Sequence, residues 1–215
     1  MKPLRIAIIG YGKIAEDEHV PAIAGNPRFE LAANVGSKAP TGGTVPGFRR
    51  HPEMFETVRD LDAVALCTPP SVRTDIAREC IARGLQVLLE KPPATTLSEI
   101  EDLRLEAEGR HVTLFTTWHS QYNPAVDAAA EALAGRRIAR MRIDWRESVR
   151  KWHPGQQWIW ESGGFGVFDP GINALSIATR IFPGPLFVRE AEMSVPANLD
   201  MPIAASIRFS SPAAA

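Results

Sequence analysis

A glycine-rich turn directly after an apolar run constrains the fold of this chain more than any other feature. Leu4–Ile9 is short and apolar, which predicts a buried strand, and Gly10–Ala15 follows it as Gly-Tyr-Gly-Lys-Ile-Ala. A helical pattern continues from this turn to Ala24, and Phe29–Val35 predicts a second strand. Because strand, helix and strand fit within about 30 residues, we expect a βαβ unit with parallel strands.

The spacing of small residues in this turn is that of a dinucleotide-binding loop. Gly10 allows the tight turn, Gly12 lets a pyrophosphate approach the backbone, and Ala15 permits close packing of the helix on the strand. An incidental glycine turn is the alternative, but the flanking strand and helix favour the dinucleotide. The residues expected to bind the cofactor here are Gly10, Tyr11, Gly12, Lys13 and Ile14.

The residues after the second predicted strand indicate which nicotinamide cofactor binds. Proteins that bind NAD usually carry Asp or Glu at this position, where it bonds to the ribose 2′-OH. This chain has Ser37 and Lys38 instead, with no acid. A hydroxyl and a cation suit a 2′-phosphate, so we expect NADP in preference to NAD, with Arg49 and Arg50 as further candidates. The alternative for Lys38 is a solvated loop charge.

Strand and helix patterns continue to alternate as far as Thr117. Leu61–Thr68, Gln86–Leu89 and Val112–Thr117 predict strands, and Thr74–Arg83 and Leu97–Ala107 predict helices, the second with Thr96 or Ser98 as its cap. This alternation predicts an α/β fold, with a doubly wound parallel sheet that forms a dinucleotide-binding domain over residues 1–119.

Polar residues end two of these strands. Gln86–Leu89 leads straight into Glu90-Lys91-Pro92, and the preceding strand ends at Cys67-Thr68-Pro69. In open α/β sheets, ligands bind at the carboxyl ends of the strands, so we expect Lys91 to face a ligand. A surface ion pair at a strand end is the alternative. The further residues expected at the cofactor edge are Cys67, Thr68, Pro69, Glu90 and Lys91.

The pattern changes near Ser120, and residues 120–215 are expected to form a second, α+β domain that is incomplete. Asn123-Pro124 opens an Ala-rich helical pattern that ends at Leu133. Arg137–Arg146 alternates between apolar and polar residues and predicts an antiparallel strand. Leu186–Val195 and Ile203–Phe209 predict further strands, so we expect a mostly antiparallel sheet.

Two segments of this second domain carry candidate ligand-binding residues. Lys151–Trp160 holds three tryptophans and one histidine, and aromatic faces beside polar tips suit a sugar. At least one of these tryptophans is expected to cap the core instead. Asp169 and Asn173 are one helical turn apart on one face, with Pro170 in the first turn of the helix. The alternative for Asp169 is a helix N-cap.

The composition excludes several function classes. A net charge of −1 offers no basic surface for nucleic acid or anionic membranes, and no run is long enough to span a membrane. Cys67 and Cys80 lie in a strand-like and a helix-like segment, so we expect neither a disulfide nor a metal site. A reducing cytoplasm is the expected location.

The chain resembles the Gfo/Idh/MocA family of nicotinamide-dependent oxidoreductases. The resemblance rests on Gly10–Ala15, on Glu90-Lys91-Pro92 and on Gly163-Gly164 through Asp169 to Asn173. Within the family it is most similar to the bacterial sugar 1-dehydrogenases of L-arabinose and D-galactose. That closer similarity rests on Thr117–Ser120, Arg150–Trp160 and Gly166–Ser176.

The resemblance implies an enzyme that oxidises the C1 hydroxyl of an aldopyranose to the lactone and passes a hydride to NADP or NAD. It implies Lys91 and Asp169 as catalytic residues and a possible homo-oligomer through the C-terminal sheet. We favour Asp169 as the proton acceptor, since a carboxylate is ionised at neutral pH, with Lys91 orienting the C1 oxygen; the reverse split stays open. The implied substrate-binding residues are His119, Glu147, Trp152, His153, Asp169 and Asn173.

Two departures from the family bear on these expectations. Many members carry a histidine where this chain has Asn173, so no His–Asp relay is expected at that position. Members are also longer, which leaves a truncated inactive product as one alternative. A regulatory protein that binds sugar and cofactor without turnover is another, although such relatives commonly lose the lysine or aspartate that this chain keeps. A ring-hydroxyl dehydrogenase is the third.

Overall fold

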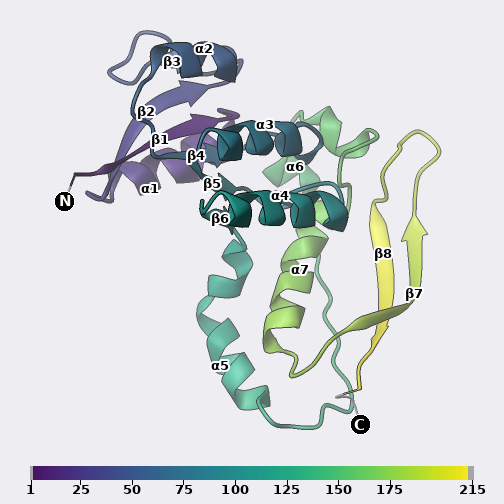
Figure 1. Cartoon of the computed structure of the whole chain (residues 1–215). Helices are drawn as coiled ribbons and strands as arrows, with labels where there is room; N and C mark the ends of the chain where they lie inside the picture. The colour runs from purple at the N-terminus through teal and green to yellow at the C-terminus, as the bar shows by residue number, and fades with distance from the viewer. Residues whose placement is uncertain (1, 213–215) are drawn as a thin grey trace. The chain divides into compact units, whose positions relative to one another are not determined.

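The computed structural model describes residues 2–212, and the chain divides into two compact units, Met1–Thr117 and Trp118–Ala215 (Figure 1). We call them the N-terminal and C-terminal units and describe each by itself.

The elements of the N-terminal unit are β1 (Leu4–Ile9), η1 (Ala15–His19), α1 (Val20–Ala24), β2 (Phe29–Val35), β3 (Gly47–Phe48), α2 (His51–Thr57), β4 (Ala63–Leu66), α3 (Pro70–Ala82), β5 (Gln86–Leu89), α4 (Leu97–Gly109) and β6 (Leu114–Thr116). Those of the C-terminal unit are η2 (His119–Tyr122), α5 (Pro124–Leu133), α6 (Val149–Trp152), η3 (Gln157–Trp160), α7 (Phe168–Ile181), β7 (Phe187–Ser194) and β8 (Ala204–Ser210).

The N-terminal unit is built on a six-stranded parallel sheet in the order β3-β2-β1-β4-β5-β6. The chain starts near the centre, moves outward through β2 to β3, and then crosses to β4 on the other side of β1. This order confirms the predicted doubly wound fold. It also gathers the carboxyl ends of all the strands at one edge of the sheet, with the change of direction between β1 and β4.

Helices cover the two faces of this sheet because the strands are apolar on both. Alternate residues such as Ala7 and Ile9 pack with residues from α2, α3 and α4. The residues between them, such as Ile6 and Ile8, pack with Ala15 and with residues of α1 on the opposite face. Residues buried on both sides explain why these strands read as continuous apolar runs.

The local structure of this unit matches the sequence expectations in part. Thr96 caps α4 through a capping box with Glu99, as one of the two predicted caps. Helix α3 begins at Pro70, one turn before its predicted start. The helix after the glycine loop begins as a π-helix, a rare form that is frequent at functional sites. The short elements β3 and α2 were not predicted.

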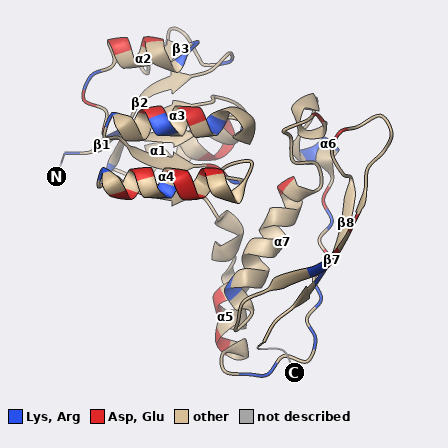
Figure 2. Ribbon diagram, turned by 45° about the vertical axis from the view of Figure 1, so that its right-hand side comes forward, with Lys and Arg blue, Asp and Glu red and all other residues tan. Residues whose placement is uncertain are grey.

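The outer sides of α3 and α4 carry mixed charge. Figure 2 shows acidic and basic residues alternating along both helices. Arg104 of α4 forms ion pairs with Glu101 and Glu108, each within one turn of it. The inward residues Leu103 and Ala107 are buried, so α4 is amphipathic with its charged side facing solvent.

The C-terminal unit combines helices with one antiparallel ribbon. Helix α5 packs against α7, where Arg180 and Asp127 pair at 3.1 Å, and β7 pairs with β8 as predicted. Every residue of β7 is exposed. A homo-oligomer through this sheet stays a prediction.

The strand predicted over Arg137–Arg146 is wrong. Within residues 2–212 this segment carries only an isolated bridge at Ile138, while β7 and β8 pair with each other. Its alternating side chains find local partners instead, such as Arg142 with Asp144 at 2.8 Å. Alternation predicts a two-faced strand only where a neighbouring backbone completes the ladder, and no backbone in the described part of the chain does so for this segment.

None of the helices among the described residues is long and apolar enough to cross a membrane. Cys67 and Cys80 are both free thiols, so the two cysteines do not pair with each other.

Candidate functional site

The carboxyl edge of the parallel sheet brings together four groups of predicted cofactor residues. Backbone hydrogen bonds extend the ladder by one residue past each strand: Cys67 N–H donates to the Ile9 carbonyl at 2.8 Å, and Glu90 N–H donates to the Leu66 carbonyl at 3.0 Å. Burial raises the pKa of the Cys67 thiol above its usual range, which favours the protonated form. Gly10, Ser37, Cys67 and Lys91 therefore all follow strands that end at the same edge.

The glycine loop has the form that a dinucleotide requires. Gly10 has a φ of 98°, and a Cβ there would lie 2.5 Å from the backbone nitrogen of Thr68, so only glycine fits. At Gly12 a Cβ would meet only the Gly10 carbonyl oxygen, at 3.9 Å, which leaves open space beside that backbone. A pyrophosphate needs this kind of close approach, so the loop fits the predicted cofactor.

The other predicted residues of this loop have separate roles. Tyr11 N–H donates to the Val35 carbonyl at 2.8 Å, which fixes the loop against the end of β2. Lys13 forms an ion pair with Asp17, four residues along the same helix, and both side chains are about half exposed. Ile14 is 41% exposed. The Tyr11 side chain also packs against the core, while Lys13 and Ile14 lie at the surface of the loop.

Two cations lie at the surface beyond the ends of β2 and β3, Lys38 after β2 and Arg49 after β3. Ser37, Lys38 and Arg49 are all exposed, and the Arg49 guanidinium donates from Nη1 to the Ser37 carbonyl at 2.6 Å. This bond ties Arg49 to the segment that carries Lys38, although the two are 11 residues apart in sequence. Arg49 is thus a structural neighbour of the Ser37-Lys38 pair.

Glu90 is a buried carboxylate that holds the start of the Lys91 turn. It is 8% exposed, and its Oε1 lies 2.8 Å from His19 Nε2. Its Oε2 accepts a hydrogen bond from the Lys91 backbone N–H at 3.1 Å. Burial alone raises the pKa of Glu90, but the bonds from His19, Thr117 and Lys91 outweigh it and lower the pKa below its usual range. Nothing in the sequence pattern paired His19 with Glu90.

Replacing Glu90 with glutamine is expected to lower the free energy of unfolding at pH 7 by about 1–3 kcal/mol, because charged hydrogen bonds are lost. The folded-state pKa of Glu90 is lowered, so its contribution is complete above the ordinary value of 4.5 and is lost as pH falls through the lowered pKa. The difference between wild type and Glu90→Gln should therefore shrink below pH 4.5. Urea unfolding at several pH values measures it. The exposed Glu56→Gln is the control, and an equal pH dependence in both variants contradicts the assignment.

The C-terminal unit places Asp169 and Asn173 one turn apart on α7, with each residue 6% exposed. Helix α7 starts at Phe168 and its N-cap is Val167, so the alternative of Asp169 as N-cap is wrong. Asp169 Oδ2 instead lies 2.8 Å from His153 Nε2. A His–Asp pair therefore exists here, but its histidine comes from the loop before η3 and not from the position of Asn173.

His153 is held on more than one side. Its Nδ1 lies 3.3 Å from Gln156 Oε1, and its ring packs edge-to-face on Trp158 with centroids 6.1 Å apart. Trp158 in turn donates from Nε1 to Gln156 at 3.0 Å. Trp158 thus supports the histidine, while Trp152 is 49% exposed with Lys151 over its ring at 4.4 Å.

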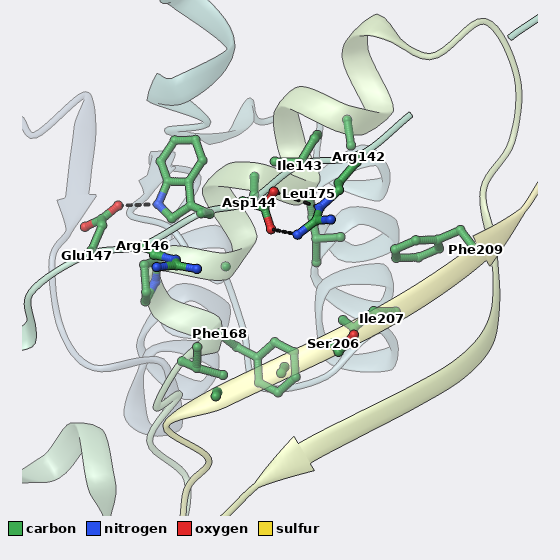
Figure 3. Close-up of a pocket in the computed structure, with 18 of the residues that line it drawn as sticks. Arg142, Ile143, Asp144, Arg146, Glu147, Phe168, Leu175, Ser206, Ile207 and Phe209 are labelled. Atoms are coloured by element: carbon green, nitrogen blue, oxygen red, sulfur yellow. Dashed lines mark hydrogen bonds and ion pairs between the residues drawn. The ribbon is translucent and has the colours of Figure 1, made fainter. Parts of the chain in front are cut away.

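A cavity of about 1380 Å³ lies in the C-terminal unit (Figure 3). Figure 3 shows Phe168 and Leu175 of α7 and Ile207 of β8 among the residues that line it, with Glu147 at the left of the view. Glu147 is exposed and accepts a hydrogen bond from Trp145 Nε1 at 2.6 Å. The cavity brings together four of the six predicted substrate residues, Glu147, Trp152, His153 and Asp169, and its described lining does not include His119 or Asn173.

The remaining predicted substrate residue is His119. His119 is exposed in η2, and its Nδ1 lies 3.5 Å from the Ser120 hydroxyl. Among residues 2–212, no group of three or more His, Cys, Asp or Glu side chains could hold a metal ion.

Comparison with known proteins gives this geometry a family. Residues 4–118 match the Gfo/Idh/MocA oxidoreductase family, described by its NAD-binding Rossmann fold. The chain is 47% identical over 212 residues to a galactose 1-dehydrogenase of Pseudomonas fluorescens, covering 99% of this chain and 68% of the relative. A crystal structure of D-galactose-1-dehydrogenase from Rhizobium etli superposes with a TM-score of 0.90 at 46% identity, covering 99% of this chain and 68% of that one.

A more distant structure has the same fold. The WlbA dehydrogenase in complex with NADH and UDP-GlcNAcA superposes with a TM-score of 0.83 at 18% identity, covering all of this chain and 66% of that one. The family match spans more than half of the chain, and the galactose 1-dehydrogenase matches almost all of it. The chain belongs to the Gfo/Idh/MocA family of oxidoreductases.

Proposed function

We propose that this chain is an aldose 1-dehydrogenase that oxidises the C1 hydroxyl of D-galactose or L-arabinose to the lactone with NADP. The observation that carries the proposal is the 47% identity to a galactose 1-dehydrogenase across 99% of the chain. A buried carboxylate, Asp169, paired with the partly buried His153 in the cavity lining adds chemical support, because oxidation of a hydroxyl requires a proton acceptor.

Asp169 is proposed as the proton acceptor. Oxidation at C1 breaks the O–H and C1–H bonds and forms the C1=O bond of the lactone. Asp169 takes the hydroxyl proton, and His153, 2.8 Å away, orients the carboxylate and can share that proton. Asn173, one turn further along α7, is proposed to hold a sugar hydroxyl or orient Asp169. A bound oxidised nicotinamide cofactor would supply the acceptor for the hydride that leaves C1.

Lys91 is proposed to orient and polarise the C1 oxygen. It follows β5 at the edge where the glycine loop lies, and its backbone is held by the carboxylate of Glu90. A cation hydrogen-bonded to the reacting oxygen stabilises the charge that develops as the proton leaves. Glu147, Trp152 and His119 are proposed as further contacts to the sugar.

Lys38 is proposed to bind the 2′-phosphate of NADP, with Ser37 and Arg49 beside it. Lys38→Ala is expected to weaken NADP binding about tenfold or more, because a charged hydrogen bond is lost, and to leave NAD binding unchanged. Fluorescence titration with both cofactors measures the two dissociation constants. Arg28→Ala, an exposed change before β2, is the control. Equal losses for NADP and NAD, or no loss, contradict the preference for NADP.

A sugar panel tests the proposed activity. The chain is incubated with NADP and D-galactose, L-arabinose, an inositol or an amino sugar, and NADPH and lactone are measured together. Turnover with the two aldoses and not with inositol is the expected result. Turnover with inositol alone identifies a ring-hydroxyl dehydrogenase. Binding of sugar and cofactor without turnover supports a regulatory relative instead.

A further inference from the structure

A buried arginine donates hydrogen bonds to the backbone of the turn that carries Lys91. Arg73 lies on α3 and is 2% exposed. Its Nη1 donates to the carbonyls of Glu90 and Pro92, and its Nη2 donates to the carbonyl of Thr68. A buried cation is costly unless it is hydrogen-bonded, so these contacts are integral to the site.

These carbonyls belong to two different strand ends. Thr68 lies beyond β4, and Glu90 and Pro92 lie beyond β5, the neighbouring strand in the sheet. A guanidinium offers five donors in a rigid planar fork, so one side chain can bind both ends at fixed spacing. Lysine, with one nitrogen on a flexible stem, cannot reproduce this geometry.

We propose that Arg73 is a positioning residue that sets the direction of Lys91. It binds the carbonyls of the residues before and after Lys91, while the Glu90 carboxylate binds the Lys91 N–H. The backbone around Lys91 is thereby restrained on both sides. The bond from Arg73 to the Thr68 carbonyl connects the same turn to the end of β4. The backbone of Thr68 also lies directly beside Gly10 of the glycine loop. The inference rests on the proposed catalytic role of Lys91.

The variant Arg73→Lys tests this role because it keeps the charge and loses the fork. It is expected to lower kcat about 100-fold, the cost of displacing a catalytic group by about 1 Å, while KM for the sugar changes less than about twofold. Arg78→Lys, on the same helix but partly exposed and paired with Glu106 at 2.7 Å, is the matched control and should keep kcat. A wild-type kcat in Arg73→Lys overturns the proposal.

Hydrogen exchange followed by mass spectrometry supplies a readout that needs no turnover. Amides of the peptide around Lys91 should exchange at least about tenfold faster in Arg73→Lys, while amides of β1 keep their wild-type rates. Unchanged exchange around Lys91 overturns the proposal, even if the wild type has no sugar dehydrogenase activity and the proposed function fails. If Arg73→Lys and Arg73→Gln both fail to fold, Arg73 serves stability of the unit and the positioning role is rejected.

Discussion

Replacing Lys91 with alanine is expected to lower kcat with D-galactose or L-arabinose by about 100- to 1000-fold, the usual cost of removing a donor to a developing oxyanion. The loss should fall on kcat more than on the affinity for NADP, because the glycine loop and the Ser37-Lys38 segment remain. Steady-state kinetics, together with fluorescence titration of NADP, measure the two quantities. The substitution keeps the backbone hydrogen bonds at the end of β5, so the free energy of unfolding should change little.

Two further variants sharpen this experiment. Lys2→Ala removes an exposed lysine that precedes β1 and should leave kcat unchanged. Lys91→Arg keeps a cation but changes its length and shape, so kcat should stay well below wild type. An unchanged kcat in a folded Lys91→Ala protein that binds NADP would remove Lys91 from the reaction.

Much of the N-terminal unit could be predicted because its elements obey local rules. Ile6 to Ile9 of β1 and Val87 and Leu89 of β5 are buried, and the apolar composition of both segments identifies them as inner strands. Only glycine fits at position 10, because the backbone of Thr68 lies too close for a Cβ. A constraint of this kind can be recognised in the sequence as a glycine. The parallel order then follows from the alternation of strands and helices.

The C-terminal unit was harder to predict because its structure depends on partners distant in sequence. Arg137–Arg146 has the alternation of a strand, yet pairing and not pattern decides whether a ladder forms. In the N-terminal unit, two short features were missed for a different reason, and the two-residue strand β3 is too short to carry a periodic signal. The π-helical turn at Ala15–His19 likewise has no compositional signature that separates it from an α-helix.

The sequence names candidate residues for the site, and these roles stay predictions, but it does not indicate which side chains pair. Asp169 and His153 were both named from their segments, whereas their 2.8 Å contact depends on how the loop before η3 folds onto α7. His19 and Arg73 were missed as partners of the Lys91 turn for the same reason. Side chains that act on a distant backbone leave no spacing rule in the sequence.

Replacing Asp169 with asparagine is expected to lower kcat about 100- to 10,000-fold, the range attributed to general base catalysis. Asparagine keeps the size of the side chain and can still bond to His153, so the buried end of α7 should stay folded. The change therefore isolates the loss of the proton acceptor. Kinetics with both aldoses measure kcat, and thermal unfolding verifies the fold.

The comparison of Asp169→Asn with Lys91→Ala decides which group accepts the proton. Asp127→Asn, an exposed change on α5 at an ion pair with Arg180, is the control and should keep kcat. If Asp169 is the base, its loss cannot be offset by Lys91, which is a donor while it is protonated. Substantial activity in Asp169→Asn that rises with pH would instead assign the base to Lys91, because a lysine accepts a proton only after it has lost its own.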